Sequence, residues 1–146
     1  MKVRRILAAK SGGIISIRPE QTIREAITLL TKHNIGAVIV VVPGQERPVG
    51  IVSERDIIRR AATDEACFSD PVETIMTREL VTGMPQDDLY SVAHTMTERR
   101  FRHLPIMDEG RLVGIISIGD VLKAQRDAYR GEVDTREAQL LAGGEE

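Results

Sequence analysis

The sequence predicts an α/β fold made of two tandem β-α-β-β-α repeats that pack with pseudo-two-fold symmetry. The first observation is that residues 50–56, GIVSERD, return in similar form as residues 114–120, GIISIGD. In each copy an apolar strand runs into a helix that begins with Ser-x-x-Asp. The second observation is that Pro19 and Pro85, which each end a short apolar stretch, are 66 residues apart. Halves of about 60 residues are small for independent cores, so we expect the two halves to share one.

The first repeat begins with a short apolar strand at residues 14–17. Pro19 ends this strand, because proline has no N–H to donate to a strand ladder. Thr22 then opens a helix, since Thr22 and Glu25 form a capping-box pattern. The residues that follow at helical spacing on one face are Ile23, Ala26, Ile27 and Leu30.

A hairpin and a second helix complete the first repeat. Residues 35–42 form a β-branched run whose length suits a strand buried on both faces. The turn-rich residues 43–48 connect it to a return strand at residues 49–52. Ser53 starts the second helix, and the chain loosens at residues 63–70.

The second repeat follows the same order from residue 71. We expect a strand at residues 80–82, ended by Pro85, and then a helix whose apolar face consists of Leu89, Val92, Ala93 and Met96. Residues 101–106 align with residues 35–40 at the offset of 66. The hairpin around residues 108–110 is two residues shorter than its counterpart, which brings the offset to 64 at Gly114.

We therefore divide the chain into residues 1–66 as the first repeat, residues 71–126 as the second, and residues 127–146 as a helical or partly disordered tail. The tail is rich in Arg, Glu and Ala and continues the second motif helix, with an interruption expected at Gly131. Residues 143–146 are flexible and polar, and we expect them to fray.

Composition indicates a globular protein and excludes several functions. Hydrophobic residues make up 42% and charged residues 29% of the 146 residues. The 20 Lys and Arg are matched by 22 Asp and Glu, so the basic excess of nucleic-acid-binding proteins is missing. We interpret the basic residues at 98–102 as a helix end. Residues 35–42 are too few to span a membrane and residues 1–10 lack the apolar core of a secretory signal, so we expect a cytoplasmic protein.

No metal site and no catalytic group is predicted. Cys67 is the only cysteine, and we assign it no role beyond that of a small apolar residue in a linker. The histidines lack the spacing of metal ligands, and we expect His94 to be exposed. Ser53 and Asp56 lie one helical turn apart without a His or Lys base between them, so we expect no enzyme.

Ser-x-x-Asp has a structural interpretation beside any functional one. A Ser N-cap with an acidic residue at the third helical position is close to a capping box, and a single copy would indicate no more. Helix N-termini also bind anions, because free N–H groups and the positive end of the dipole point there. Recurrence of the motif within a longer repeat favours a binding site.

These residues resemble the signature positions of a pair of cystathionine β-synthase (CBS) domains. The resemblance is carried by residues 50–56, 114–120, 35–38 and 102–106, and by the Ile-Met-Thr at residues 75–77. It covers about residues 3–126 and leaves no further catalytic domain, which implies a stand-alone regulatory module. Such modules bind adenine nucleotides, among them AMP, ADP, ATP, S-adenosylmethionine and NAD(H), between the repeats. They usually form homodimers.

The resemblance implies two pockets, each of which mixes residues of both repeats. The residues of the first pocket are Ile15, Gly36, Ala37, Ser117 and Asp120. Those of the mirror pocket are Val81, Arg102, His103, Pro105, Ser53 and Asp56, with Arg55 beside them. A carboxylate can accept both ribose hydroxyls, and a hydroxyl can donate to phosphate. Because Gly36 and Gly119 stand where the other copy has Arg102 and Arg55, we expect the pockets to accept different charge.

Three functions stay open. The chain is a module that senses AMP, ATP or NAD for an unidentified client protein, a structural dimerisation module without ligand, or a nucleotide-consuming enzyme. We favour the first, with no catalytic cofactor and with neither nucleic acid nor membrane as a partner. A homodimer is expected because the apolar faces of the two predicted amphipathic helices exceed what one thin sheet per half can cover.

Overall fold

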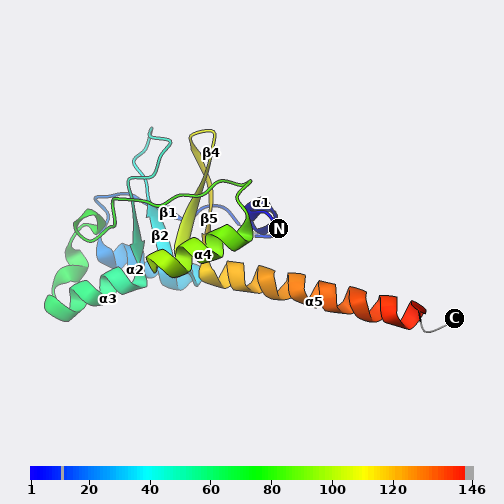
Figure 1. Cartoon of the computed structure of the whole chain (residues 1–146). Helices are drawn as coiled ribbons and strands as arrows, with labels where there is room; N and C mark the ends of the chain where they lie inside the picture. Colours follow the sequence, from blue (N-terminus) through cyan, green and yellow to red (C-terminus); the bar gives the residue numbers. More distant parts are fainter. Residues whose placement is uncertain (11, 144–146) are drawn as a thin grey trace.

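The computed structural model describes residues 1–10 and 12–143 and confirms the α/β fold of two repeats (Figure 1). The elements of the first half are α1 (Val3–Ala9), β1 (Ser16–Ile17), α2 (Ile23–His33), β2 (Ala37–Val40), β3 (Gly50–Ser53) and α3 (Glu54–Thr63). Two 3₁₀ helices follow, η1 (Cys67–Ser69) and η2 (Val72–Thr74). The second half contains α4 (Leu89–Arg99), β4 (His103–Asp108), β5 (Arg111–Ser117) and α5 (Ile118–Gly143).

The strands form one small sheet in each half, and the two sheets have matching registers. In the first sheet β1 is parallel to β2, and β2 is antiparallel to β3, with Ala37 opposite Ser53. In the second sheet β4 is antiparallel to β5, with His103 opposite Ser117. These two pairs are related by the offsets of 66 and 64 found in the sequence, so the sequence repeat is also a repeat in space.

The prediction of a strand at residues 80–82 is wrong, because these residues are in no strand. The backbone meets β4 only at Gly83, whose N–H donates to the carbonyl of Pro105 at 2.9 Å and whose carbonyl accepts from Met107 at 2.8 Å. A Cβ atom at residue 83 would stand 2.9 Å from Leu104 Cδ2. Gly83 can approach β4 closely because it has no side chain. The pairing with β4 does not extend to the larger residues 80–82 before it.

The helix starts follow the predicted caps. Thr22 Oγ1 accepts from the N–H of Glu25 at 3.1 Å, and the Glu25 carboxylate accepts from the N–H of Thr22 at 3.3 Å, which completes the capping box of α2. The last turns of α2 and α4 end on Asn34 and Arg100 in the left-handed conformation, at φ 50° and 57°. The basic run at residues 98–102 is therefore a helix end, as expected.

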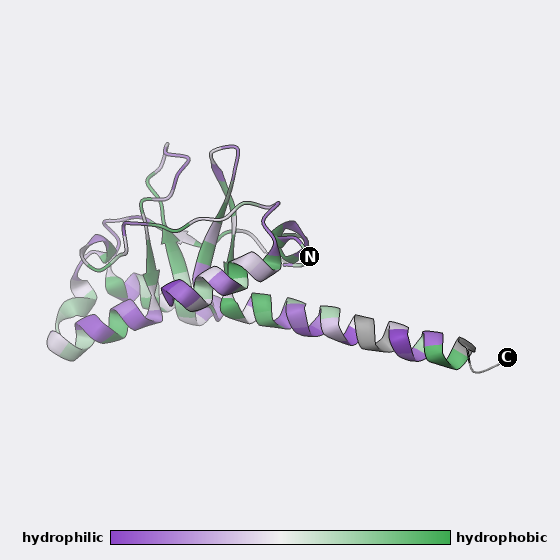
Figure 2. Cartoon of the chain, viewed as in Figure 1, coloured by the Kyte–Doolittle hydropathy of each residue, from purple (hydrophilic) through white to green (hydrophobic). Residues whose placement is uncertain are grey.

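Apolar side chains gather in two clusters, so the expectation of a single shared core is wrong. Each half is completed by a segment outside its β-α-β-β-α unit: the first by Cys67, Val72 and Met76, the second by Val3 and Ile6 of α1. Figure 2 shows the corresponding hydrophobic strands between the helices and the hydrophilic hairpin tips. Cys67 is fully buried in the first cluster, where it packs as a small apolar residue.

Helix α1 packs with the second half, although it precedes the first in the sequence. Val3 and Ile6 contact the cluster around Leu89 and Ile116, and the N–H of Val3 donates to the carbonyl of Asp87 at 3.0 Å. The sequence-based division at residue 66 stays a prediction, but residues 3–9 lie against the other repeat.

Helix α5 runs without a break from Ile118 to Gly143 and extends beyond the body of the molecule (Figure 1). The helical tail is confirmed, and the interruption expected at Gly131 is wrong. A single glycine costs a helix only about 1 kcal/mol relative to alanine, and the Gly131 carbonyl accepts from Thr135 Oγ1 at 2.8 Å. The fraying expected at residues 143–146 concerns Gly143, which ends α5, and residues that lie outside the described part of the chain.

Candidate functional site

Both Ser-x-x-Asp motifs are helix caps. Ser53 Oγ accepts from the N–H of Asp56 at 3.2 Å, while Asp56 Oδ2 accepts from the N–H of Ser53 at 2.8 Å and from Ser53 Oγ at 3.0 Å. In the second copy, Ser117 Oγ accepts from the N–H of Asp120 at 3.1 Å, and Asp120 Oδ2 accepts from the N–H of Ser117 at 2.8 Å. The structural interpretation of the motif therefore holds in both halves.

A cavity of about 580 Å³ lies at the start of α3 and is lined by both halves. It contains all the residues that the sequence assigned to the mirror pocket, which are Ser53, Arg55, Asp56, Val81, Arg102, His103 and Pro105. Pockets of this size commonly bind small molecules. We call it the Asp56 cavity.

Four arginines line the Asp56 cavity, and the sequence predicted only Arg55 and Arg102. Arg59 and Arg100 line it beside Arg55 and Arg102, while Glu54, Asp56 and Glu79 supply the acidic groups. The signal for Arg59 was present, because residues 55 and 59 are one helical turn apart and share a face of α3. Arg100 lines the cavity from the C-terminal end of α4, where it has a left-handed backbone conformation. No local sequence pattern predicts that position.

His103 lies half-buried at the start of β4, against the first half of the molecule. A Cβ atom at Gly36 would stand 3.1 Å from its Nε2. Burial lowers the pKa of His103, and the positive charges of Lys10 and Arg102 act in the same direction. The negative charges of Glu54 and Asp120 oppose this shift of the His103 pKa.

The residues of the first predicted pocket have different surroundings in the structure, and that pocket stays a prediction. The structure places Gly36 in the Asp56 cavity, while Ala37 is buried opposite Ser53 and Ile15 packs on the first core. Ala37 begins β2 and is buried, whereas Gly36 precedes the strand, and only Gly36 of the two lines the Asp56 cavity. Asp120 lines a different cavity, of about 840 Å³, between α1 and α5.

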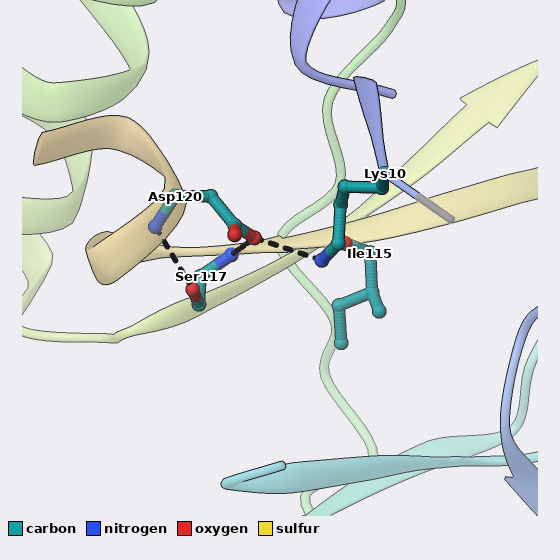
Figure 3. Close-up of polar contacts among 4 residues, drawn as sticks. All are labelled: Lys10, Ile115, Ser117 and Asp120. Atoms are coloured by element: carbon teal, nitrogen blue, oxygen red, sulfur yellow. Dashed lines mark hydrogen bonds and ion pairs between the residues drawn. The ribbon is translucent and has the colours of Figure 1, made fainter. Parts of the chain in front are cut away.

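Asp120 makes an ion pair that its counterpart Asp56 does not make in the described part of the chain. Lys10 Nζ donates to Asp120 Oδ2 at 2.8 Å and to the carbonyl of Ile115 at 2.9 Å (Figure 3). Burial works to raise the pKa of Asp120, but the hydrogen bonds from Lys10 and Ser117 outweigh it and hold that pKa below its ordinary value.

The remaining histidines lie outside the Asp56 cavity. His33 and His94 are exposed, and among residues 1–10 and 12–143 no cluster of His, Cys, Asp and Glu could hold a metal ion. Within the same ranges no helix is both long and apolar enough to cross a membrane.

Comparison with known proteins identifies the two halves. The family model of the CBS domain matches residues 5–63 and again residues 72–127. The chain is 34% identical over 136 residues to the CBS domain-containing protein CBSX3, mitochondrial, of Arabidopsis thaliana, and covers 66% of that protein and 90% of itself.

Solved structures show the same fold. The CBS-domain containing protein ATU1752 from Agrobacterium tumefaciens superposes with a TM-score of 0.82 at 36% identity, covering 86% of this chain and 99% of that one. The CBS domain protein PAE2072 from Pyrobaculum aerophilum, complexed with AMP, gives 0.73 at 29% identity over 82% and 89% of the chains. The CBS domain pair of protein MJ0100, in complex with 5-methylthioadenosine and S-adenosyl-L-methionine, gives 0.75 at 28% identity over 88% and 98%. The chain belongs to the CBS domain family and consists of a pair of CBS domains.

Proposed function

We propose that this CBS pair is a regulatory module that binds an adenine nucleotide in the Asp56 cavity. The observation that carries the proposal is the joining, in one cavity, of a helix N-terminus, a carboxylate and arginines from both repeats. The N-terminus of α3 presents backbone N–H groups and a positive dipole end to an anion. Arg55 and Arg102 offer planar donors that suit phosphate oxygens.

The cavity also provides for the sugar and the base. Asp56 Oδ2 is engaged by Ser53, whereas Oδ1 accepts no hydrogen bond from the described residues and is available to a ribose hydroxyl. Val81, Pro105 and Ile51 supply apolar surface for a flat ring. The AMP in PAE2072 and the adenosine-containing ligands in MJ0100 support an adenosine ligand.

The ligands that we propose are AMP, ADP, ATP and NAD(H), with the more highly phosphorylated ones at the Asp56 cavity. The reason is its set of Arg55, Arg59, Arg100 and Arg102. We propose AMP for the site at Asp120, since Gly119 stands where the first repeat has Arg55 and the second motif itself therefore supplies no arginine. The cations that line the cavity at Asp120 come from residues outside the motif, which are Arg5, Lys10, Lys123 and Arg136. Each well-placed bond to phosphate contributes about 1.5–3 kcal/mol when solvent is excluded, and less when it is exposed.

We propose binding without turnover. Ser53 Oγ donates to the carboxylate of Asp56, and in the described residues no hydrogen bond joins it to His103. A hydroxyl engaged as a cap and paired with no base is a poor nucleophile.

A homodimer is part of the proposal, for a reason that differs from the one given by the sequence. Most of the apolar faces of α2 and α4 are buried within the chain, at Ile23, Ala26, Leu30, Leu89, Val92 and Met96. A dimer is supported by two large side chains that are exposed in the single chain, Ile58 on α3 at 68% and Tyr90 on α4 at 80%. Exposed apolar surface of this kind often marks an interface. A client protein and a cytoplasmic location remain predictions.

Two measurements test this function. Small molecules released by heat from the purified protein are identified by mass spectrometry, and calorimetric titration with AMP, ATP and NAD is carried out on the wild type, Asp56→Ala and Asp120→Ala. Saturable binding that Asp56→Ala weakens most for ATP supports the proposal. Identical ligand ranking in the two variants contradicts the difference between the sites. Turnover of ATP or NAD would indicate an enzyme, and absence of binding would indicate a structural dimerisation module.

A further inference from the structure

The two motif aspartates occupy equivalent positions but have different partners. In the described residues Asp56 accepts hydrogen bonds only from Ser53. Asp120 accepts from Ser117 and, on the same oxygen, from the ammonium group of Lys10 at 2.8 Å. The carboxylate that would accept a ribose hydroxyl is therefore already paired with a cation at one of the two sites.

Lys10 is held in this position by the segment that carries it. Its backbone N–H donates to the carbonyl of Ile6 at 3.1 Å, at the end of α1, and its Nζ donates also to the carbonyl of Ile115 at 2.9 Å. Helix α1 is anchored on the second core by Val3 and Ile6. Figure 3 shows Lys10 reaching Asp120 and Ile115 from this segment. The contact thus joins residues 110 positions apart in the sequence.

We propose that Lys10 is a latch on the Asp120 site, and that an adenosine ligand binds more tightly when this latch is open. The inference rests on the proposed function, because it assumes that Asp120 accepts ribose hydroxyls. Oδ1 of Asp120 accepts no hydrogen bond from the described residues, as at Asp56, but the Lys10 ammonium on Oδ2 offsets the negative charge with which the carboxylate would attract ribose hydroxyls. The ion pair therefore lowers the affinity of this site. Occupation of the site in turn frees Lys10 and loosens the end of α1. Among the described residues the first repeat has no such latch, since Asp56 makes no ion pair with a lysine or arginine there.

The effect of the latch on ligand affinity depends on how exposed the Lys10–Asp120 ion pair is. The side chain of Lys10 is 40% exposed and that of Asp120 is 26% exposed, so solvent screens the interaction. Its loss should change affinity by about three- to fivefold.

The first experiment measures the affinity of adenosine for the Asp120 site. Asp56→Ala removes the competing site, and adenosine is used because it lacks phosphate and gives Lys10 no new anion to bind. In this background Lys10→Met should bind adenosine about three- to fivefold more tightly. Lys32→Met, which removes an exposed lysine from the last turn of α2, should leave the affinity unchanged. Unchanged or weaker adenosine binding by Lys10→Met would overturn the latch.

The second experiment needs no ligand and keeps the two proposals distinguishable. Hydrogen exchange of residues 3–10 is measured in wild-type protein and in Asp120→Asn, which keeps the side-chain shape but removes the charge. Exchange should be faster in Asp120→Asn and in Lys10→Met, and the double variant should add nothing further, because both changes open one contact. Additive effects or unchanged exchange refute the latch. A wild-type protein that binds no adenine nucleotide refutes the proposed function, while the exchange result still decides whether Lys10 fastens α1.

Discussion

Gly36 of the first repeat lies directly against the imidazole of His103 of the second. A Cβ atom at Gly36 would stand 3.1 Å from His103 Nε2 and 2.9 Å from Glu54 Oε1. Both residues line the Asp56 cavity, and the absence of a side chain at residue 36 lets the Glu54 carboxylate and the His103 ring lie against the backbone there. This contact also brings the repeats together at the proposed ligand.

Gly36→Val should reduce nucleotide affinity at the Asp56 cavity by tenfold or more, which corresponds to about 1.4 kcal/mol or more. The added methyl groups would force His103 and Glu54 into the space that we assign to the ligand. Calorimetric titration of ATP into an Asp120→Ala background measures this site. Gly13→Val is the control, because a Cβ atom there meets nothing within 4 Å. Equal affinities in the two variants would show that the ligand lies elsewhere.

Gly50 and Gly114, the first residues of the two repeated motifs, should differ in their tolerance of substitution by alanine. A Cβ atom at Gly50 would stand 2.6 Å from Met76 Sδ and 3.0 Å from the carbonyl oxygen of Thr77, whereas at Gly114 it would stand 2.6 Å from Leu7 Cδ2. Leu7 can rotate away, but the Thr77 carbonyl is fixed by its hydrogen bond from the N–H of Ile51. We expect Gly50→Ala to lower the free energy of unfolding by about 1–3 kcal/mol and Gly114→Ala by less. Urea denaturation compares them, and the reverse order would contradict this account.

Ser53→Ala separates helix capping from ligand binding. Loss of the cap on α3 should lower the free energy of unfolding by about 1 kcal/mol without nucleotide, and it should also weaken nucleotide binding. Thr22→Ala removes the equivalent cap from α2, away from the cavity, so it should cost similar stability and leave affinity unchanged. Thermal unfolding and calorimetry measure the two effects. If both variants bind nucleotide as the wild type does, Ser53 is a cap only.

His103 should make the unliganded protein less stable as the pH falls below about 6.5, the ordinary pKa of histidine. Burial lowers its pKa in the folded state, so the unfolded chain binds the proton more readily below that pH. This contribution is absent above about pH 6.5 and grows as the pH falls toward the lower folded-state pKa. His103→Gln should flatten the decline in urea midpoint between about pH 6.5 and 5. The exposed His94→Gln is the matched control and should keep the wild-type slope, and equal slopes in all three proteins would exclude His103 as the cause.

Gly131→Ala should strengthen α5 without changing the core. A Cβ atom at residue 131 meets nothing within 4 Å, and alanine is favoured over glycine in a helix interior by about 1 kcal/mol. Circular dichroism should show more helix, and hydrogen exchange should slow around residue 131. The urea midpoint of the core should stay the same. Unchanged exchange would mean that the glycine does not limit this helix.

The sequence by itself determined the parts of this structure that depend on neighbours along the chain. Capping residues specified where α2 and α3 begin, and apolar spacing specified which face of α2 is buried, because a helix satisfies its backbone hydrogen bonds locally. The repeat added the register, since Ala37–Ser53 and His103–Ser117 follow from the same pattern copied once. The resemblance to CBS domains anticipated part of the lining of the Asp56 cavity, whereas Arg59 and Arg100 were not anticipated.

Only the tertiary structure decided what lies against each copy. The equivalent glycines Gly50 and Gly114 face different segments, the linker at Met76 in one case and Leu7 of α1 in the other. Nothing in the local pattern of residues 1–10 shows that they pack on the second repeat or that Lys10 reaches Asp120, 110 residues away. Such contacts depend on how distant apolar surfaces are covered when the whole chain is compact, and short-range periodicity carries no information about them. The two carboxylates of one repeated motif thus have different partners, because the segments that complete the two halves are themselves not repeated.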